Sequence, residues 1–219
     1  TQKLPIPIIY GGPVKVAGNV FYERFLDAQK IRVIRYIGIS EGPVESIYDV
    51  YANEFNLQSG TSPITGCSAS VYTNTTNTTR GSRDPSGRRP YPNDLAFVAV
   101  TLKAQENLSG NPIITSMVKG RRVWTPTGTK FSRNPAWIIR DFLTNTRYGL
   151  GIPSAKLDHA SFLAAANYCD ELVEGLPRFS LDYIIDTQKS AIDILSEMLS
   201  CCRGYILHRE KIGLYIDMP

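Results

Sequence analysis

The sequence predicts an α+β chain in which an antiparallel β-rich domain, a sandwich or a barrel, is followed by a three-helix plus β-hairpin domain. Two patterns lead to this prediction. Before residue 130, apolar residues alternate with polar ones and tight turns separate the runs, as in strands. After residue 131, apolar residues recur every three or four positions, which indicates amphipathic helices. We therefore expect domains at 1–130 and 131–219.

The first domain is predicted to consist of strands with no helix between them. The clearest strand follows from Ile31, Val33, Ile37 and Ile39, which share one face at period two. Strands joined by tight turns favour an antiparallel arrangement. The predicted strands cover residues 4–10, 14–22, 31–39, 47–51 and 96–102.

A loop insertion is expected at 57–93. Most of it is rich in Thr, Asn, Ser, Gly and Pro and nearly free of aliphatic residues, which predicts a long exposed loop. Two interpretations are open: a solvated surface loop, or an arm that contacts a neighbouring subunit or an anionic partner. The candidate contact residues on the loop are Arg80, Arg83, Arg88 and Arg89.

A second basic group, Lys119, Arg121 and Arg122, lies close to the end of the first domain. We interpret it as a charged hairpin tip. The alternative is a phosphate-binding group, because Lys and Arg side chains contact phosphate oxygens. No G-x-x-x-x-G-K phosphate loop accompanies these residues.

The second domain is organised around a helix predicted within Asn134–Leu150, NPAWIIRDFLTNTRYGL. Asn134 suits the cap because its side-chain oxygen can accept from backbone N–H groups of the first turn. Pro135 suits the first helical position, and the glycines after Tyr148 end the helix. Helical spacing predicts a heavy apolar face that packs in the core and comprises Trp137, Ile138, Ile139, Phe142 and Leu143.

Two more helices and a hairpin are expected to complete this domain. Asp158 and Thr187 are the predicted caps. The apolar stripe of the second helix comprises Phe162, Ala166, Cys169, Leu172 and Val173. That of the third comprises Ala191, Ile194, Leu195, Met198, Leu199 and Cys202. Strands are predicted at residues 178–185, 205–208 and 212–216, the last two forming the hairpin.

Composition argues against several functions. The chain is 42% hydrophobic and 20% charged, which is ordinary for a globular protein, and a net charge of +4 does not by itself indicate nucleic-acid binding. No apolar run reaches the ~20 residues of a membrane helix. The cysteines lack zinc-ligand spacing and are expected to be reduced and structural. Because the only histidines are His159 and His208 and no G-x-S-x-G motif is present, we expect no catalytic site, metal or cofactor.

Several motifs, in order, carry a resemblance. They are PIIYGGPVKVAGNV, GISEGPVESIYDVYANEF, LSGNPIITSMVKGRRVW, NPAWIIRDFLTNTRYGL, YCDELV and PRFSLDYII. Together they resemble the central module of phage tail-tip proteins, the baseplate-hub or host-specificity proteins of lambda-like phages, and the related hub of gene transfer agents. Gly38, Ser46 and Leu181 depart from the family pattern. The resemblance covers most of the chain outside 57–93, and the first and last residues suggest a piece of a longer protein.

The resemblance implies a structural protein that closes the tail tube, links it to receptor-binding parts and forms the conduit for genome ejection. The implied partners are other tail-tip, tail-tube and tape-measure proteins, with a homotrimer in the assembled tail. Phage DNA would pass without sequence-specific binding, and the host receptor would be reached only through other parts. The implied location is the phage tail, after synthesis in the bacterial cytoplasm. The structural core of the family motif is Trp137, Ile138, Phe142, Leu143, Tyr148 and Gly149.

Two other classes of function compete with this one. A cell-surface or carbohydrate-binding β-domain would use tyrosine-bearing loops, here Tyr72 and Tyr91, to contact sugars. A tail-associated cell-wall hydrolase would show turnover on peptidoglycan. Glycan binding and peptidoglycan turnover are the measurements that separate these alternatives from a structural role.

Overall fold

The computed structural model describes residues 5–58, 64–73, 95–105, 108 and 110–218. The chain divides into two compact units. Unit 1 comprises Thr1–Ile9 and Pro13–Arg121, and unit 2 comprises Tyr10–Gly12 and Arg122–Pro219. The first strand, β1 (Ile8–Tyr10), crosses the first of these boundaries, because Ile9 belongs to unit 1 and Tyr10 to unit 2.

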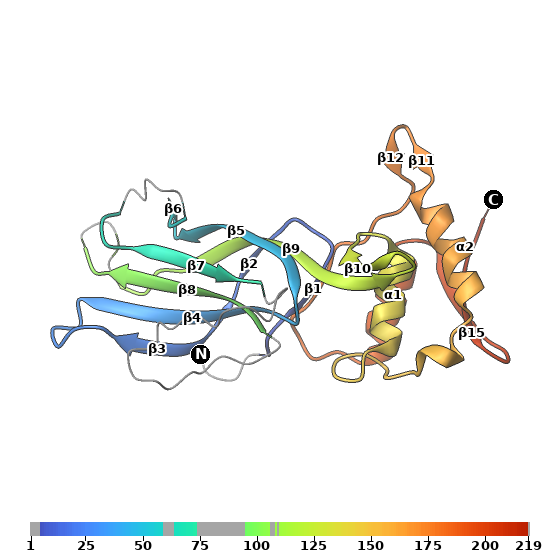
Figure 1. The fold of residues 1–219 in the computed structure, drawn as a ribbon, viewed down its shortest axis with the longest axis horizontal. Helices are drawn as coiled ribbons and strands as arrows, with labels where there is room; N and C mark the ends of the chain where they lie inside the picture. The colour runs from blue at the N-terminus through green and yellow to red at the C-terminus, as the bar shows by residue number, and fades with distance from the viewer. Residues whose placement is uncertain (1–4, 59–63, 74–94, 106–107, 109, 219) are drawn as a thin grey trace. The chain divides into compact units, whose positions relative to one another are not determined.

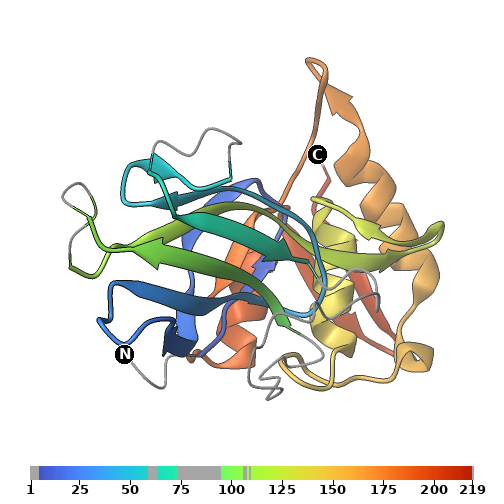
Figure 2. The same cartoon turned by 60° about the vertical axis from the view of Figure 1, so that its left-hand side comes forward.

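Unit 1 is built from antiparallel strands, as predicted. A four-stranded sheet has the order β3-β4-β8-β7, and Figures 1 and 2 show its strands side by side. The strands of this sheet are β3 (Asn19–Phe25), β4 (Arg32–Glu41), β7 (Ser68–Tyr72) and β8 (Leu95–Lys103). In a second sheet, β9 lies between β2 and β5, and β6 pairs with β5. Among the described residues this sheet has five strands, of which β10 (Gly128–Phe131) belongs to unit 2; the other four are β2 (Val14–Ala17), β5 (Val44–Ala52), β6 (Phe55–Asn56) and β9 (Ile114–Thr125).

One strand prediction and one loop prediction in unit 1 were wrong. The strand expected at 14–22 is split, because the chain leaves the β9 edge after β2 and joins β4 as β3. The long loop expected at 57–93 contains β7, which pairs with β8. The sequence of β7, SASVY, is short and dominated by small residues, so its strand pattern is weak. Residues 59–63 and 74–93 of the predicted loop lie outside the described residues.

Aromatic side chains fill one side of the four-stranded sheet. Tyr22 stacks on Tyr36 with ring centroids 5.0 Å apart, and Tyr72 stacks on Phe97 at 4.5 Å. Ile37 and Ile39, which were predicted to share the apolar face of β4, are buried on the strand's other side. The second half of β4 is therefore covered on both faces.

Unit 2 contains the three predicted helices, α1 (Pro135–Thr144), α2 (His159–Asp170) and α3 (Ala191–Ser200), with a short 3-10 helix, η1 (Ser154–Lys156). Helix α1 packs against α2 and α3, and α2 packs against β15. The predicted hairpin forms from β14 (Gly204–His208) and β15 (Ile212–Ile216), and β10 (Gly128–Phe131) pairs with the end of β9. The stripe predicted for α3 is largely correct, because Ile194, Met198 and Cys202 are buried.

The stripe predicted for α2 extends too far. Helix α2 ends at Asp170, so Leu172 and Val173 form β11 (Leu172–Val173), which pairs with β12 (Leu176–Pro177). Glu174 and Gly175 join the two strands with φ of 53° and 83°, the geometry of a two-residue type I′ turn. This hairpin projects beyond the end of α2 (Figure 1), with Leu172 71% and Leu176 70% exposed.

Two details around α3 also differ from expectation. Ser190, not Thr187, is the cap, because its hydroxyl accepts a hydrogen bond from the Asp193 N–H at 3.1 Å. The strand expected at 178–185 is reduced to β13 (Tyr183–Ile185). The residues before β13 make isolated backbone hydrogen bonds to different segments; the Leu181 N–H, for example, donates to the Arg133 carbonyl at 2.7 Å. They therefore do not pair with one neighbouring strand.

Candidate functional site

The start of α1 is fixed by one side chain with two hydrogen bonds. Asn134 Oδ1 accepts from the Ala136 N–H at 3.0 Å, which makes Asn134 the predicted cap. Asn134 Nδ2 donates to the Ala166 carbonyl on α2 at 2.9 Å. Because Asn134 is buried, these contacts replace the water it would otherwise bind. The residue therefore caps α1 and links it to α2.

The apolar residues of the helix motif lie in the interior of unit 2. Trp137, Ile138, Phe142 and Leu143 are all buried, with Trp137 the most exposed at 6%. Gly149 follows closely, and a Cβ built on it would lie 1.9 Å from the Phe142 carbonyl oxygen. Any side chain at this position would force the turn after α1 away from the helix.

A carboxylate on α1 receives two tyrosine hydroxyls. Asp141 Oδ2 accepts from Tyr10 at 2.6 Å and from Tyr148 at 2.7 Å. Tyr10 is fully buried, and burial followed by the neighbouring Asp141 raises the pKa of its hydroxyl. The hydroxyl thus stays protonated at neutral pH and donates to Asp141. Tyr148 belongs to the helix motif, whereas Tyr10 is 131 residues away from Asp141 in sequence, so no local pattern could have paired them.

A second carboxylate holds the N-terminal glycines in unit 2. Asp182 Oδ1 accepts from the Gly12 N–H at 2.7 Å, and both Asp182 oxygens accept from the Arg133 guanidinium. Burial raises the pKa of Asp182, but the bonds from Arg133 and Gly12 outweigh it, so the pKa lies below its usual value. Gly11 has a φ of 68°, and a Cβ there would lie 2.2 Å from Asp182 Oδ1. The Tyr-Gly-Gly motif is therefore a contact segment of unit 2.

The partly exposed aromatic cluster of unit 2 was not predicted from the sequence. Trp124, on β9, is 38% exposed. Its ring meets the Trp137 and His159 rings in T-shaped contacts, with centroids 5.9 and 5.2 Å away. The Arg140 guanidinium lies 3.8 Å from the centroid of the Trp124 ring. His159 is exposed and contacts Trp124 through one side of its ring.

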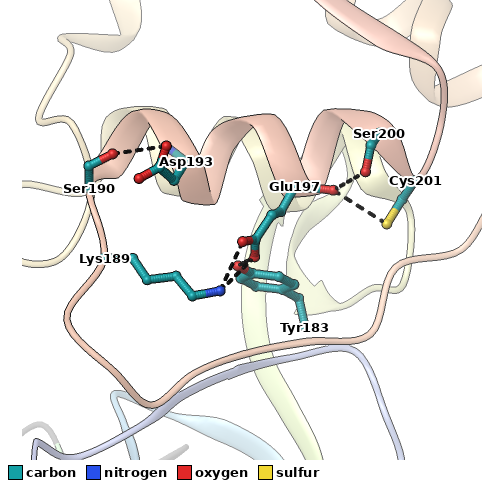
Figure 3. Close-up of polar contacts among 7 residues, drawn as sticks. All are labelled: Tyr183, Lys189, Ser190, Asp193, Glu197, Ser200 and Cys201. Carbon is teal, nitrogen blue, oxygen red and sulfur yellow. Dashed lines mark hydrogen bonds and ion pairs between the residues drawn. The ribbon is translucent and has the colours of Figure 1, made fainter.

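Helix α3 carries an exposed polar cluster (Figure 3). Glu197 accepts a short hydrogen bond from the Tyr183 hydroxyl and forms an ion pair with Lys189, whose Nζ lies 2.9 Å from Oε1 and 3.0 Å from Oε2. Burial, and then Glu197, raise the pKa of Tyr183. The cluster ties α3 to the segment that precedes it. Neighbouring Cys201 has a pKa raised by burial and by Cys202, which disfavours the reactive thiolate.

The predicted basic residues are distributed differently from expectation. Lys119, Arg121 and Arg122 do not form a hairpin tip, because β9 continues to Thr125. Arg121 donates to the Glu41 carbonyl at 2.6 Å, and Arg122 donates to the Thr129 carbonyl at 2.9 Å. Outside the described residues lie Arg80, Arg83, Arg88 and Arg89.

The remaining candidates are metal-binding groups, membrane-spanning helices, the cysteines and the two tyrosines named for sugar binding. Within the described ranges, no cluster of His, Cys, Asp and Glu could hold a metal ion, and no described helix is long and apolar enough to cross a membrane. The four cysteines are free, and Cys67, Cys169 and Cys202 are buried. Tyr72 is stacked on Phe97, and Tyr91 lies outside the described residues.

Known proteins resemble the chain in sequence and in fold. No protein-family profile matches it. Over 108 residues, 44% of this chain, it is 35% identical to "Tip attachment protein J" of Escherichia phage SECphi27. The match covers 9% of the length of that protein. A chain from the "Virion of native gene transfer agent (GTA) particle" has a TM-score of 0.60 to this one at 15% identity, over 99% of this chain and 53% of that chain.

At 15% identity the second likeness is one of fold. The first is a likeness of sequence over part of the chain, to a protein of the tail tip. Both agree with the family resemblance described in the sequence analysis. Over 108 residues the chain is therefore similar in sequence to a tip attachment protein, and its fold is similar to that of a chain from a gene transfer agent virion.

Proposed function

We propose that the chain is a structural component of a phage or prophage tail tip or baseplate hub. It closes the tail tube, links the tube to receptor-binding parts and contributes to the conduit for genome ejection. The observation that carries the proposal is the 35% identity to a tip attachment protein. The fold likeness to a virion chain over 99% of this chain supports it.

The partners of such a component are other tail-tip, tail-tube and tape-measure proteins. The chain takes part in a homotrimer in the assembled tail, and phage DNA passes it without base-specific contacts. Its place is the virion, after synthesis in the host cytoplasm. The domains at 1–130 and 131–219, the first an antiparallel sandwich or barrel, are the building blocks of this component.

The way unit 2 is held together supports a role that depends on shape. Three buried or partly buried polar contacts join distant segments: Asn134 to α2, Asp141 to Tyr10, and Asp182 to Gly12. Buried polar groups with satisfied partners favour one packing arrangement over others. A rigid unit can transmit force or displacement to its neighbours without changing its own conformation.

Localisation in particles tests the proposal. An epitope tag is placed in the Arg209–Lys211 turn of the β14–β15 hairpin, whose residues are exposed, in the gene of a producing phage. Immunogold labelling at the tip of purified tails, with a trimeric mass after mild cross-linking, is the expected result. Labelling on the capsid would refute the proposal. So would infectious particles that lack the tag while the tagged full-length protein is present in the lysate. Glycan-array binding and peptidoglycan turnover are measured on the same protein.

A further inference from the structure

The guanidinium of Arg140 has no hydrogen-bond acceptor among the residues that the structure describes. Its side chain lies over the Trp124 ring at 3.8 Å and makes no hydrogen bond or ion pair with any residue that the structure describes. A guanidinium carries five N–H donors in a fixed fork. Burial lowers its pKa, and the charge of Asp141 only partly opposes this effect. An anion bound at the fork would compensate for the lost hydration.

The acidic residues closest in sequence to this cluster are already engaged. Asp141, next to Arg140, accepts from two tyrosine hydroxyls. Asp158, next to His159, accepts from the Ala160 N–H at the start of α2. On β9, alternation places Arg122 on the same face as Trp124. The surroundings of Trp124 thus carry positive charge, which favours an acidic ligand.

The geometry favours a carboxylate over a nucleobase. Arg140 occupies a face of the Trp124 ring, while Trp137 and His159 approach the ring at 75° and 71°. Stacking on that face by a base is therefore blocked. The contact with Trp124 holds the guanidinium in place, and its N–H groups, which no described residue accepts from, remain for a ligand. Arg recognises planar carboxylates through two parallel hydrogen bonds.

We propose that Trp124, Arg140 and His159 form a docking site for an Asp or Glu side chain presented by a neighbouring protein. Tryptophan and arginine are the residue types that most often dominate binding energy at protein interfaces. Arg140 would bind the carboxylate, and the exposed part of Trp124 would cover the apolar stem of the ligand. The site is inferred from this geometry alone. The identification of the neighbour as a tail protein depends on the proposed function.

The first test measures binding in solution. Trp124 and Trp137 are the only tryptophans of the chain, so intrinsic fluorescence reports on the cluster directly. The full chain is titrated with N-acetyl-tetraglutamate, and separately with the oligonucleotide dT12. We expect the peptide to change the fluorescence, and R140Q to weaken its binding at least about tenfold. R140K, which keeps the charge and loses the fork, should bind with intermediate affinity.

The matched control is R209Q, an exposed arginine in the β14–β15 turn, which should bind as the wild type does. Thermal melting of each variant checks folding. Peptide binding unchanged in R140Q would overturn the proposal. So would dT12 binding that is tighter than peptide binding and is lost in R140Q, because the site would then be one for phosphate.

The second test identifies the neighbour in particles. R140K places a primary amine at the site, and a carbodiimide joins an amine to a carboxylate in direct contact. We expect R140K particles to yield a cross-link to an Asp or Glu of another polypeptide, and R209K particles to lack it. Correct tail-tip location without this cross-link would overturn the docking site. Peptide binding that depends on Arg140, in a protein absent from tails, would support the site and refute the tail proposal.

Discussion

Helix α1 and the β11–β12 hairpin of unit 2 are both rich in apolar residues, yet the helix is mostly buried and the hairpin is exposed. Seven of the ten residues of α1 are buried, whereas all four strand residues of the hairpin are exposed. The difference lies in what fixes each element. A capped helix with apolar residues at helical spacing has a defined face that packs against α2 and α3. The hairpin instead leaves α2 at a turn that suits Glu174 and Gly175, and no helix face remains for its leucines.

The largest expected effect is at the centre of α1. Phe142→Ala should lower the free energy of unfolding by about 3–5 kcal/mol, because Phe142 is fully buried and the change leaves a cavity. Urea denaturation followed by tryptophan fluorescence measures it. A loss below about 1 kcal/mol would mean that α1 is less important to the core than its burial indicates.

A smaller loss is expected at the cap. Asn134→Ala removes the bond to Ala136 and leaves the Ala166 carbonyl without its donor. The expected cost is about 2 kcal/mol, the sum of a lost cap and a lost buried hydrogen bond between α1 and α2. Asn134→Asp is the sharper comparison, because it keeps the cap acceptor and loses the donor to α2. If both variants unfold at the same urea concentration, the link to α2 accounts for the loss and the cap adds little.

Asp182 should make stability depend on pH in the acidic range. Its folded pKa is lower than the unfolded value of about 3.9, so its contribution is present above that value and disappears as the pH falls towards the folded pKa. Because the Arg133–Asp182 pair is partly exposed, we expect only about 1 kcal/mol from it at neutral pH. Asp182→Asn should remove this part of the acid transition. If the difference in the free energy of unfolding between wild type and Asp182→Asn stayed the same from pH 7 to pH 3, Asp182 would not be the source of the pH dependence.

The smallest effect is expected in the hairpin. Leu172→Ser should change the free energy of unfolding by no more than about 0.5 kcal/mol, because Leu172 is 71% exposed. Chemical denaturation of this variant beside Phe142→Ala tests the contrast between the two elements directly. A loss comparable to that of Phe142→Ala would show that the hairpin folds back onto the protein in solution.

Local patterns were sufficient for the elements whose stability is local. The cap at Asn134, the period of α3 and the β14–β15 hairpin were all predictable from neighbouring residues. The end of α2 was missed because the apolar residues of LVEGL fit two structures equally well: a continuation of the helical stripe, or a β-hairpin. The candidate site was missed for a different reason: Trp124 lies on a strand and Arg140 on a helix, and only tertiary packing brings them to 3.8 Å. The same holds for Tyr10 and Asp141.

The placement of Tyr10–Gly12 in unit 2 has a consequence for inheritance. This segment and the bulk of unit 2 are separated in the gene by the whole of Pro13–Arg121. A recombination event near codon 122 would combine the Asp141 and Asp182 of one parent with the tyrosine and glycines of the other. Functional hybrids between divergent homologues should therefore arise only where both parents carry the Tyr-Gly-Gly motif, or where crossovers lie on both sides of the Pro13–Arg121 segment.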